Sequence, residues 1–62
     1  MVYNNITKLC KSKNISIAAL EKSVGLGNAT IRGWVESDPS ASKLKRVADF
    51  FGVTVDELLK ED

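Results

Sequence analysis

Apolar residues recur at helical spacing in five stretches of this chain, and turn-forming residues separate the stretches. In the first stretch, Val2, Ile6 and Leu9 follow at intervals of four and three residues, which places them on one face of a helix. No segment shows the sustained alternation of a half-buried strand. The expected helices cover residues 2–13, 16–24, 28–36, 41–51 and 55–60. The pattern therefore predicts an all-α fold, a compact five-helix bundle that forms one domain over residues 1–62.

Residues typical of helix ends support these boundaries. Ser16 and Thr54 carry the hydroxyl that caps a helix start, whereas Gly25 and Gly52 favour the left-handed conformation that ends a helix. Pro39 follows the third helix and stops it. The expected first residues are Gly27 or Asn28 for the third helix and Ser40 or Ser42 for the fourth. A short connection therefore separates the second helix from the third.

Composition limits what can hold so small a domain together. The chain of 62 residues has one cysteine and no histidine, which excludes an internal disulfide and a zinc site built from cysteine and histidine. We expect a core drawn from the 44% of apolar residues, with Cys10 as a small buried member, and no cofactor or metal. The longest apolar run is far shorter than the roughly 20 residues of a membrane span. A soluble protein with a cytoplasmic location and no membrane partner is therefore expected.

Charge is unevenly distributed, although the net charge is only +1. Residues 1–48 carry eight basic and three acidic side chains, a net charge of +5. Residues 49–62 carry one basic and five acidic side chains, a net charge of −4. The basic body favours a polyanionic partner such as DNA, whereas the acidic end would be repelled by phosphate.

Residues 17–35 contain the most informative motif. Two short helices joined by a tight, glycine-containing turn can present the second helix to the major groove of DNA. The residues concerned are Gly25 and Leu26 at the turn, Gly27 and Asn28 at the start of the second helix, and Ile31 and Trp34 at its buried positions. This run resembles the helix-turn-helix of the phage lambda repressor-like family, also called Xre or Cro-type regulators. The resemblance extends through Pro39, the apolar stripe of Leu44, Val47 and Ala48, and residues 52–59.

Two positions depart from the family pattern. The family usually begins the second helix of the bundle with glutamine and has alanine four residues later, where the two helices meet; here these positions are Ile17 and Glu21. Loss of the glutamine removes a side chain that supports a phosphate contact in the family. Glu21 must turn outward or find a cationic partner such as Arg32, because an unpaired buried charge is costly.

The resemblance implies double-stranded DNA as the partner, bound through the first residues of the third helix and those a turn later. Asn28 can make a paired donor and acceptor contact with adenine, and Arg32 can reach guanine or a phosphate. Ala29 can touch a thymine methyl group, Thr30 can bond a phosphate, and Gly33 would permit close approach without reading a base. Asn28 has an alternative role as the helix cap, and the two roles compete for one side chain.

The same resemblance places the turn after the third helix and the start of the fourth against the DNA backbone. The candidate phosphate contacts are Ser37, Ser40, Ser42 and Lys43. The cluster of Lys43, Lys45 and Arg46 has a second interpretation as an ordinary solvated face.

Function is expected to be regulatory and not enzymatic. The sequence has no histidine, no evident carboxylate pair and no glycine-rich phosphate loop, and no small-molecule substrate is expected. The resemblance implies a bacterial or phage transcriptional regulator that represses by occupying an operator. The competing hypothesis is a protein-interaction module of the same fold with weak or no DNA binding.

A single recognition helix covers little DNA, so a homodimer on paired half-sites is expected. The candidate dimer contacts lie in the last helix and are Val55, Leu58 and Leu59. The alternative is that these residues only seal the core of the domain.

Overall fold

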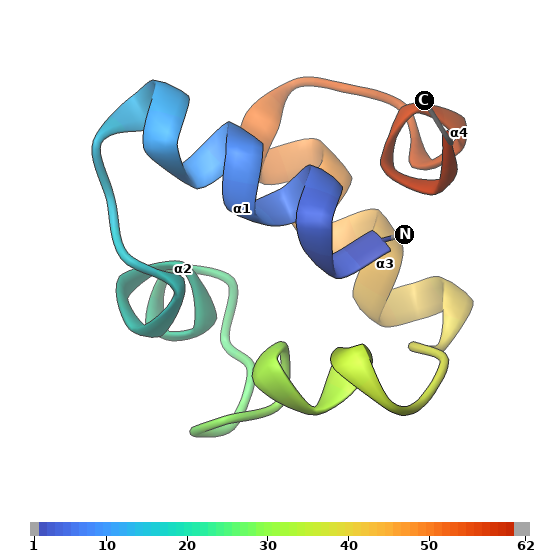
Figure 1. The fold of residues 1–62 in the computed structure, drawn as a ribbon, viewed down its shortest axis with the longest axis horizontal. Coiled ribbons are helices and arrows are strands. Elements are labelled where there is room, and N and C mark those ends of the chain that lie inside the picture. The colour runs from blue at the N-terminus through green and yellow to red at the C-terminus, as the bar shows by residue number, and fades with distance from the viewer. Residues whose placement is uncertain (1, 61–62) are drawn as a thin grey trace.

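The computed structural model describes residues 2–60, and within this range it contains helices and no strand. The α-helices are α1 (Val2–Lys13), α2 (Ile17–Ser23), α3 (Ala41–Phe51) and α4 (Val55–Leu59), and a short 3₁₀ helix, η1 (Arg32–Val35), lies between α2 and α3 (Figure 1). The all-α prediction is confirmed. The five-helix prediction is correct only in part, because the described residues form four α-helices and one 3₁₀ turn.

The predicted helix starts at Ser16 and Thr54 are confirmed, and Ser40 rather than Ser42 begins α3. Each of the three hydroxyls accepts a hydrogen bond from the backbone amide three residues later, at 3.0 Å for Ser16, 3.4 Å for Ser40 and 3.1 Å for Thr54. These bonds satisfy amides that have no partner within the first turn of a helix.

Three helices end in the same way. Asn14, Gly25 and Gly52 follow α1, α2 and α3 and all have left-handed backbones, with φ of 58°, 74° and 72°. The amide of the apolar residue after each one bonds a carbonyl five residues back: Ile15 to Cys10, Leu26 to Glu21 and Val53 to Ala48. This is the Schellman arrangement, in which a left-handed residue lets the chain turn while the last carbonyls keep their partners.

The core lies where α1 crosses the other elements. α1 contacts α2, η1 and α4, and α3 packs on α4. The buried apolar residues come from every element and from the turn before η1: Ile6, Cys10, Leu20, Ile31, Trp34, Leu44, Val47, Ala48, Phe51 and Leu58. The predicted core positions of the second helix of the motif, Ile31 and Trp34, are therefore confirmed, as is burial of Cys10.

The third predicted helix is wrong in extent and type. An α-helix was expected over residues 28–36, but residues 28–31 form turns and only Arg32–Val35 form a 3₁₀ helix. Ala29 has φ of 66°, which interrupts any helix that begins at Asn28. Two glycines, Gly27 and Gly33, also lower the helix propensity of this stretch.

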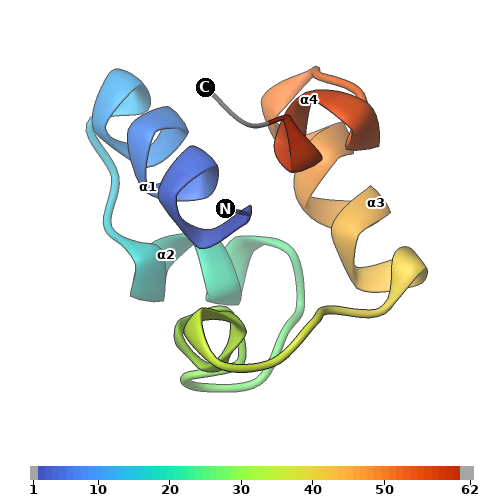
Figure 2. The same cartoon turned by 45° about the vertical axis from the view of Figure 1, so that its right-hand side comes forward.

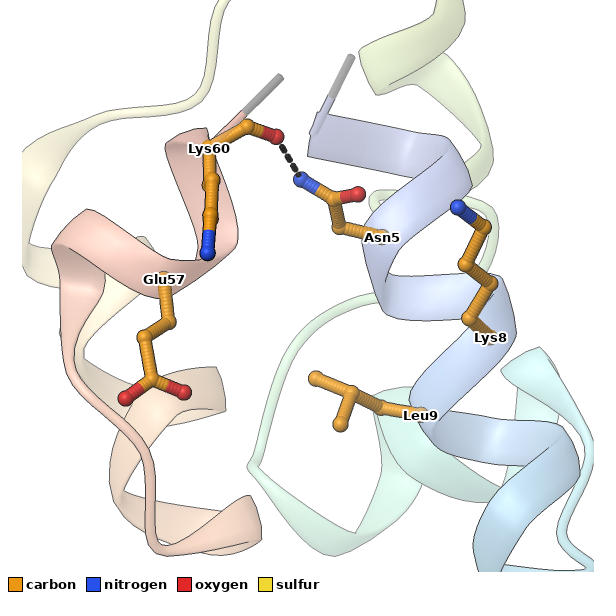
Figure 3. Close-up of a pocket in the computed structure, with 5 residues that line it drawn as sticks. All are labelled: Asn5, Lys8, Leu9, Glu57 and Lys60. Atoms are coloured by element: carbon orange, nitrogen blue, oxygen red, sulfur yellow. Dashed lines mark hydrogen bonds between the residues drawn. The ribbon is translucent and has the colours of Figure 1, made fainter. Parts of the chain in front are cut away.

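A side-chain clamp holds the end of α4 against α1. The Nδ2 group of Asn5 donates to the backbone carbonyls of Leu58, at 2.8 Å, and Lys60, at 2.6 Å. Figure 3 shows the second of these bonds at the rim of an open hollow that Lys8, Leu9 and Glu57 also line. Because the last carbonyls of a helix have no partner within it, Asn5 both satisfies α4 and fixes its position.

Candidate nucleic-acid interface

The predicted DNA contacts gather at one end of the molecule. Figures 1 and 2 show α2, the turn after it, η1 and the start of α3 at this end, with α4 at the opposite end. We call residues 28–35 the recognition segment. Ile31 and Trp34 are buried and anchor the recognition segment in the core, while Asn28, Ala29 and Arg32 are exposed.

Glu21 caps the recognition segment from α2. Its side chain is buried, and its two oxygens accept from the backbone amides of Ala29, at 3.0 Å, and Ile31, at 2.8 Å. Nη2 of Arg32 lies 3.5 Å from Oε1 of the same carboxylate. Glu21 was expected either to turn outward or to find a cationic partner such as Arg32. The structure shows the second outcome, and Glu21 also accepts hydrogen bonds from two backbone amides.

The environment of Glu21 stabilises its charged form. Burial alone raises the pKa of the carboxyl group, but hydrogen bonds from the backbone amides of Ala29 and Ile31, together with the Arg32 charge, outweigh burial and lower the pKa. Glu21 is therefore ionised at neutral pH and forms the buried half of an ion pair whose other half reaches solvent.

Asn28 and Arg32 form a pair on the exposed surface. Nη2 of Arg32 donates to Oδ1 of Asn28 at 3.0 Å. The capping alternative for Asn28 is not what the structure shows, since η1 has no side-chain cap at its own start and Glu21 takes the amides of Ala29 and Ile31. Sequence reasoning missed this role of Glu21, because the cap was sought next to the helix.

The remaining base-contact candidates differ in what they present. Thr30 is half-buried, whereas Ala29 and Gly33 are exposed. A Cβ atom built on Gly33 would meet nothing within 4 Å, so the fold itself does not require glycine there. Ala29 offers only a methyl group, and its backbone is left-handed.

The phosphate-contact candidates follow the recognition segment and are exposed. The Ser37 hydroxyl donates to the Gly33 carbonyl at 3.1 Å, and the Ser40 and Ser42 hydroxyls lie 3.3 Å apart at the start of α3. The Lys43 side chain extends from the first turn of α3. The carboxylates of Glu36 and Asp38 lie on the same stretch and offset part of the positive charge.

Lys45 and Arg46 have other surroundings. Lys45 forms an exposed ion pair with Asp49 at 3.4 Å, one turn further along α3. Arg46 lies beside the turn after α2, where its Nη1 is 3.9 Å from the position a Gly25 Cβ would take.

The three candidate dimer contacts have different exposure. Leu58 is 0% exposed and belongs to the core, so its assignment as a dimer contact is wrong. Leu59 is 47% exposed, and Val55 is half-buried against the core. Leu58 and Leu59 differ in exposure because only one side of α4 packs against α1 and α3.

Other kinds of site were sought in the part of the chain that the structure describes. Residues 2–60 contain no group of histidine, cysteine, aspartate or glutamate that could hold a metal ion. No helix among them is long and apolar enough to cross a membrane.

Comparison with known proteins agrees with this geometry. A family model described as helix-turn-helix matches residues 6–58, which is most of the chain. Searches of curated proteins and of solved structures gave no significant match. The matched range runs from the core of α1 to α4 and includes α2, the turn and the recognition segment. The chain therefore belongs to the Xre and lambda repressor-like helix-turn-helix family of DNA-binding transcription regulators.

Proposed function

We propose that this domain binds an operator in double-stranded DNA and represses transcription by occupying it and excluding RNA polymerase. The observation that carries the proposal is the two-sided character of the recognition segment. Ile31 and Trp34 fix it in the core, while Asn28 and Arg32 project donors and acceptors to solvent at one end of the molecule. Side chains held in this way can contact base edges in the major groove.

Contacts to the DNA backbone would come from the start of α3. Ser40, Ser42 and Lys43 supply hydroxyls and a positive charge there, and the first amides of an α-helix attract anions. The acidic residues Asp56 and Glu57 lie on α4, at the opposite end of the molecule (Figure 2). Binding through the recognition segment therefore keeps these acidic groups away from phosphate.

Salt dependence tests the proposal. Each neutralised phosphate should contribute about −0.9 to the slope of log affinity against log salt concentration on duplex DNA. Lys43→Ala should weaken binding to all sequences alike and reduce the magnitude of the slope by about 0.9, the contribution of one phosphate contact. Lys60→Ala removes another exposed lysine, next to α4, and is the matched control, with no expected effect. Affinity that does not change with salt would contradict DNA binding and favour the protein-interaction module.

We further propose that two copies bind one operator, because one recognition segment has few side chains to read bases. Leu59 is the large apolar residue that α4 exposes, with Val55 partly exposed beside it. Leu59→Glu should abolish association while the far-ultraviolet circular dichroism of the folded domain remains. One copy per selected site, with no symmetry in the site, would contradict the dimer.

A further inference from the structure

Two exposed apolar side chains lie beside charges of opposite sign. Phe50 is 40% exposed and Leu59 is 47% exposed. On α3, Arg46 and Phe50 are four residues apart, so they are neighbours on one face of the helix. On α4, Asp56 and Leu59 are three residues apart and are neighbours in the same way. Each surface thus combines a large apolar side chain with a charge, which is basic on α3 and acidic on α4.

The basic surface borders an open hollow between the end of α2 and α3, which we call the α3 hollow. It is lined by Ser23, Val24, Arg46, Asp49 and Phe50. The carboxylate of Asp49 pairs with Lys45 at 3.4 Å. Within residues 2–60, by contrast, the Arg46 side chain has neither a hydrogen bond nor an ion pair. The α3 hollow therefore offers apolar surface from Val24 and Phe50 next to a cation that no acid of the described chain neutralises.

The surface of α4 carries the complementary charge. Asp56 and Glu57 are exposed, and their carboxylates have no partner in the part of the chain that the structure describes. Packing α4 against α4 of a second copy would bring these acidic groups together, and like charges facing each other across an interface are destabilising. A basic apolar surface suits Leu59 better, and each further copy of this chain supplies one in its α3 hollow.

We propose that Leu59 of one copy packs into the α3 hollow of a second copy, beside Phe50, and that Asp56 of the first copy faces Arg46 of the second. The inference rests on the proposed association through Leu59 and names the surface that this side chain covers. The contact is small, so association in solution is weak. It gains strength on DNA, where binding to neighbouring sites holds two copies close together.

Charge reversal tests the pairing, with sedimentation equilibrium of the chain in the absence of DNA as the measurement. Arg46→Glu and Asp56→Arg should each weaken self-association about tenfold or more, because each change places like charges across the contact. An equimolar mixture of the two variants should associate again, since an acid then meets a base at every contact between unlike copies. The mixture restores the contact whether it is made once or repeated across a two-fold axis.

Two further variants complete the design. Phe50→Ala should also weaken association, because it removes apolar surface from the α3 hollow. Lys13→Glu reverses the same charge as Arg46→Glu at an exposed position of α1 and is the matched control, with no expected change. Arg46 and Asp56 are exposed, so their replacement leaves the core intact, and far-ultraviolet circular dichroism checks that each variant is folded.

The outcomes separate this inference from the proposed function. Loss of association in Leu59→Glu, but not in Arg46→Glu or Phe50→Ala, would assign Leu59 to a different surface, such as α4 of the second copy, and would overturn the inference alone. A mixture that associates no better than either variant would overturn it as well. A wild-type chain that stays monomeric up to about 1 mM would overturn both this contact and the proposed role of Leu59. Binding to duplex DNA is measured separately and does not depend on any of these results.

Discussion

Replacing Glu21 by glutamine tests whether its carboxylate holds the recognition segment in place. The change preserves shape but converts one oxygen into an NH₂ group. Ala29 and Ile31 each donate a backbone amide to a different oxygen of the carboxylate, so one of them would face a second donor. Glutamine also lacks the charge that pairs with Arg32.

The expected loss of stability is large for so small a domain. A hydrogen bond to a charged group contributes about 1.5–3 kcal/mol, and a buried amide without an acceptor adds to the loss. We expect Glu21→Gln to lower the free energy of unfolding by about 2–3 kcal/mol. A domain of 62 residues has a total of roughly 3–9 kcal/mol at typical stabilities per residue. The variant therefore loses a substantial part of what keeps it folded.

Urea unfolding followed by tryptophan fluorescence is the assay, because Trp34 is a buried residue of the recognition segment itself. With a slope of about 1 kcal/mol per molar urea, the midpoint should fall by about 2–3 M. Glu36→Gln removes the same charge from an exposed position on the chain after η1 and should change stability by less than about 0.5 kcal/mol. Equal midpoints for the two variants would refute the capping role of Glu21.

The pH dependence of the stability difference between wild type and Glu21→Gln provides a second test. The pKa of Glu21 is lower in the folded protein than its ordinary value of 4.5, so the unfolded chain binds this proton more readily. The stabilisation is therefore complete above pH 4.5 and is lost as pH falls through the folded-state pKa. The stability gap between wild type and Glu21→Gln should shrink over this acidic range and stay constant near neutrality.

Three further predictions concern single positions. Ala29→Gly should stabilise the domain by about 0.5–1 kcal/mol in thermal unfolding, because glycine adopts a left-handed backbone without strain, whereas Ala19→Gly in α2 should destabilise it by a similar amount. Gly33→Ala should leave the fold intact, since open space surrounds this position. It should weaken DNA binding, measured by titration, because the added methyl group would keep the backbone from approaching DNA closely. Leu58→Ala should cost about 2–5 kcal/mol of stability, whereas Leu59→Ala should cost under about 1 kcal/mol; equal losses would contradict the assignment of one leucine to the core and one to the surface.

Much of the fold could be predicted because its signals are local in sequence. Ser16 and Thr54 cap helices through bonds that span three residues, and Gly25 and Gly52 end helices through bonds that span five or fewer. The spacing of apolar residues likewise predicts which side of each helix is buried. Such signals require no knowledge of how the helices lie in space.

The recognition segment could not be predicted in the same way, because its cap is tertiary. Glu21 reaches amides eight and ten residues further along the chain, and the positive φ of Ala29 belongs to that arrangement. Two signals in the sequence bear on it: an acid at a position where the family has alanine, and the lack of serine, threonine or aspartate before Asn28. The role of Asn5 was missed for the same reason, since its partners are more than fifty residues away.

The position of the cap also determines what Asn28 can do. A helix that begins at Asn28 would need the side chain of this residue for its own first amides, and that side chain could not then take part in reading a base. Glu21 supplies the cap from α2, so Oδ1 of Asn28 is available to Arg32. In the fold, Glu21 therefore takes the capping role that the sequence left open for Asn28. The stability of the recognition segment consequently depends on this carboxylate, and we expect a substitution at position 21 to lower that stability and to disturb the surface that Asn28 and Arg32 form.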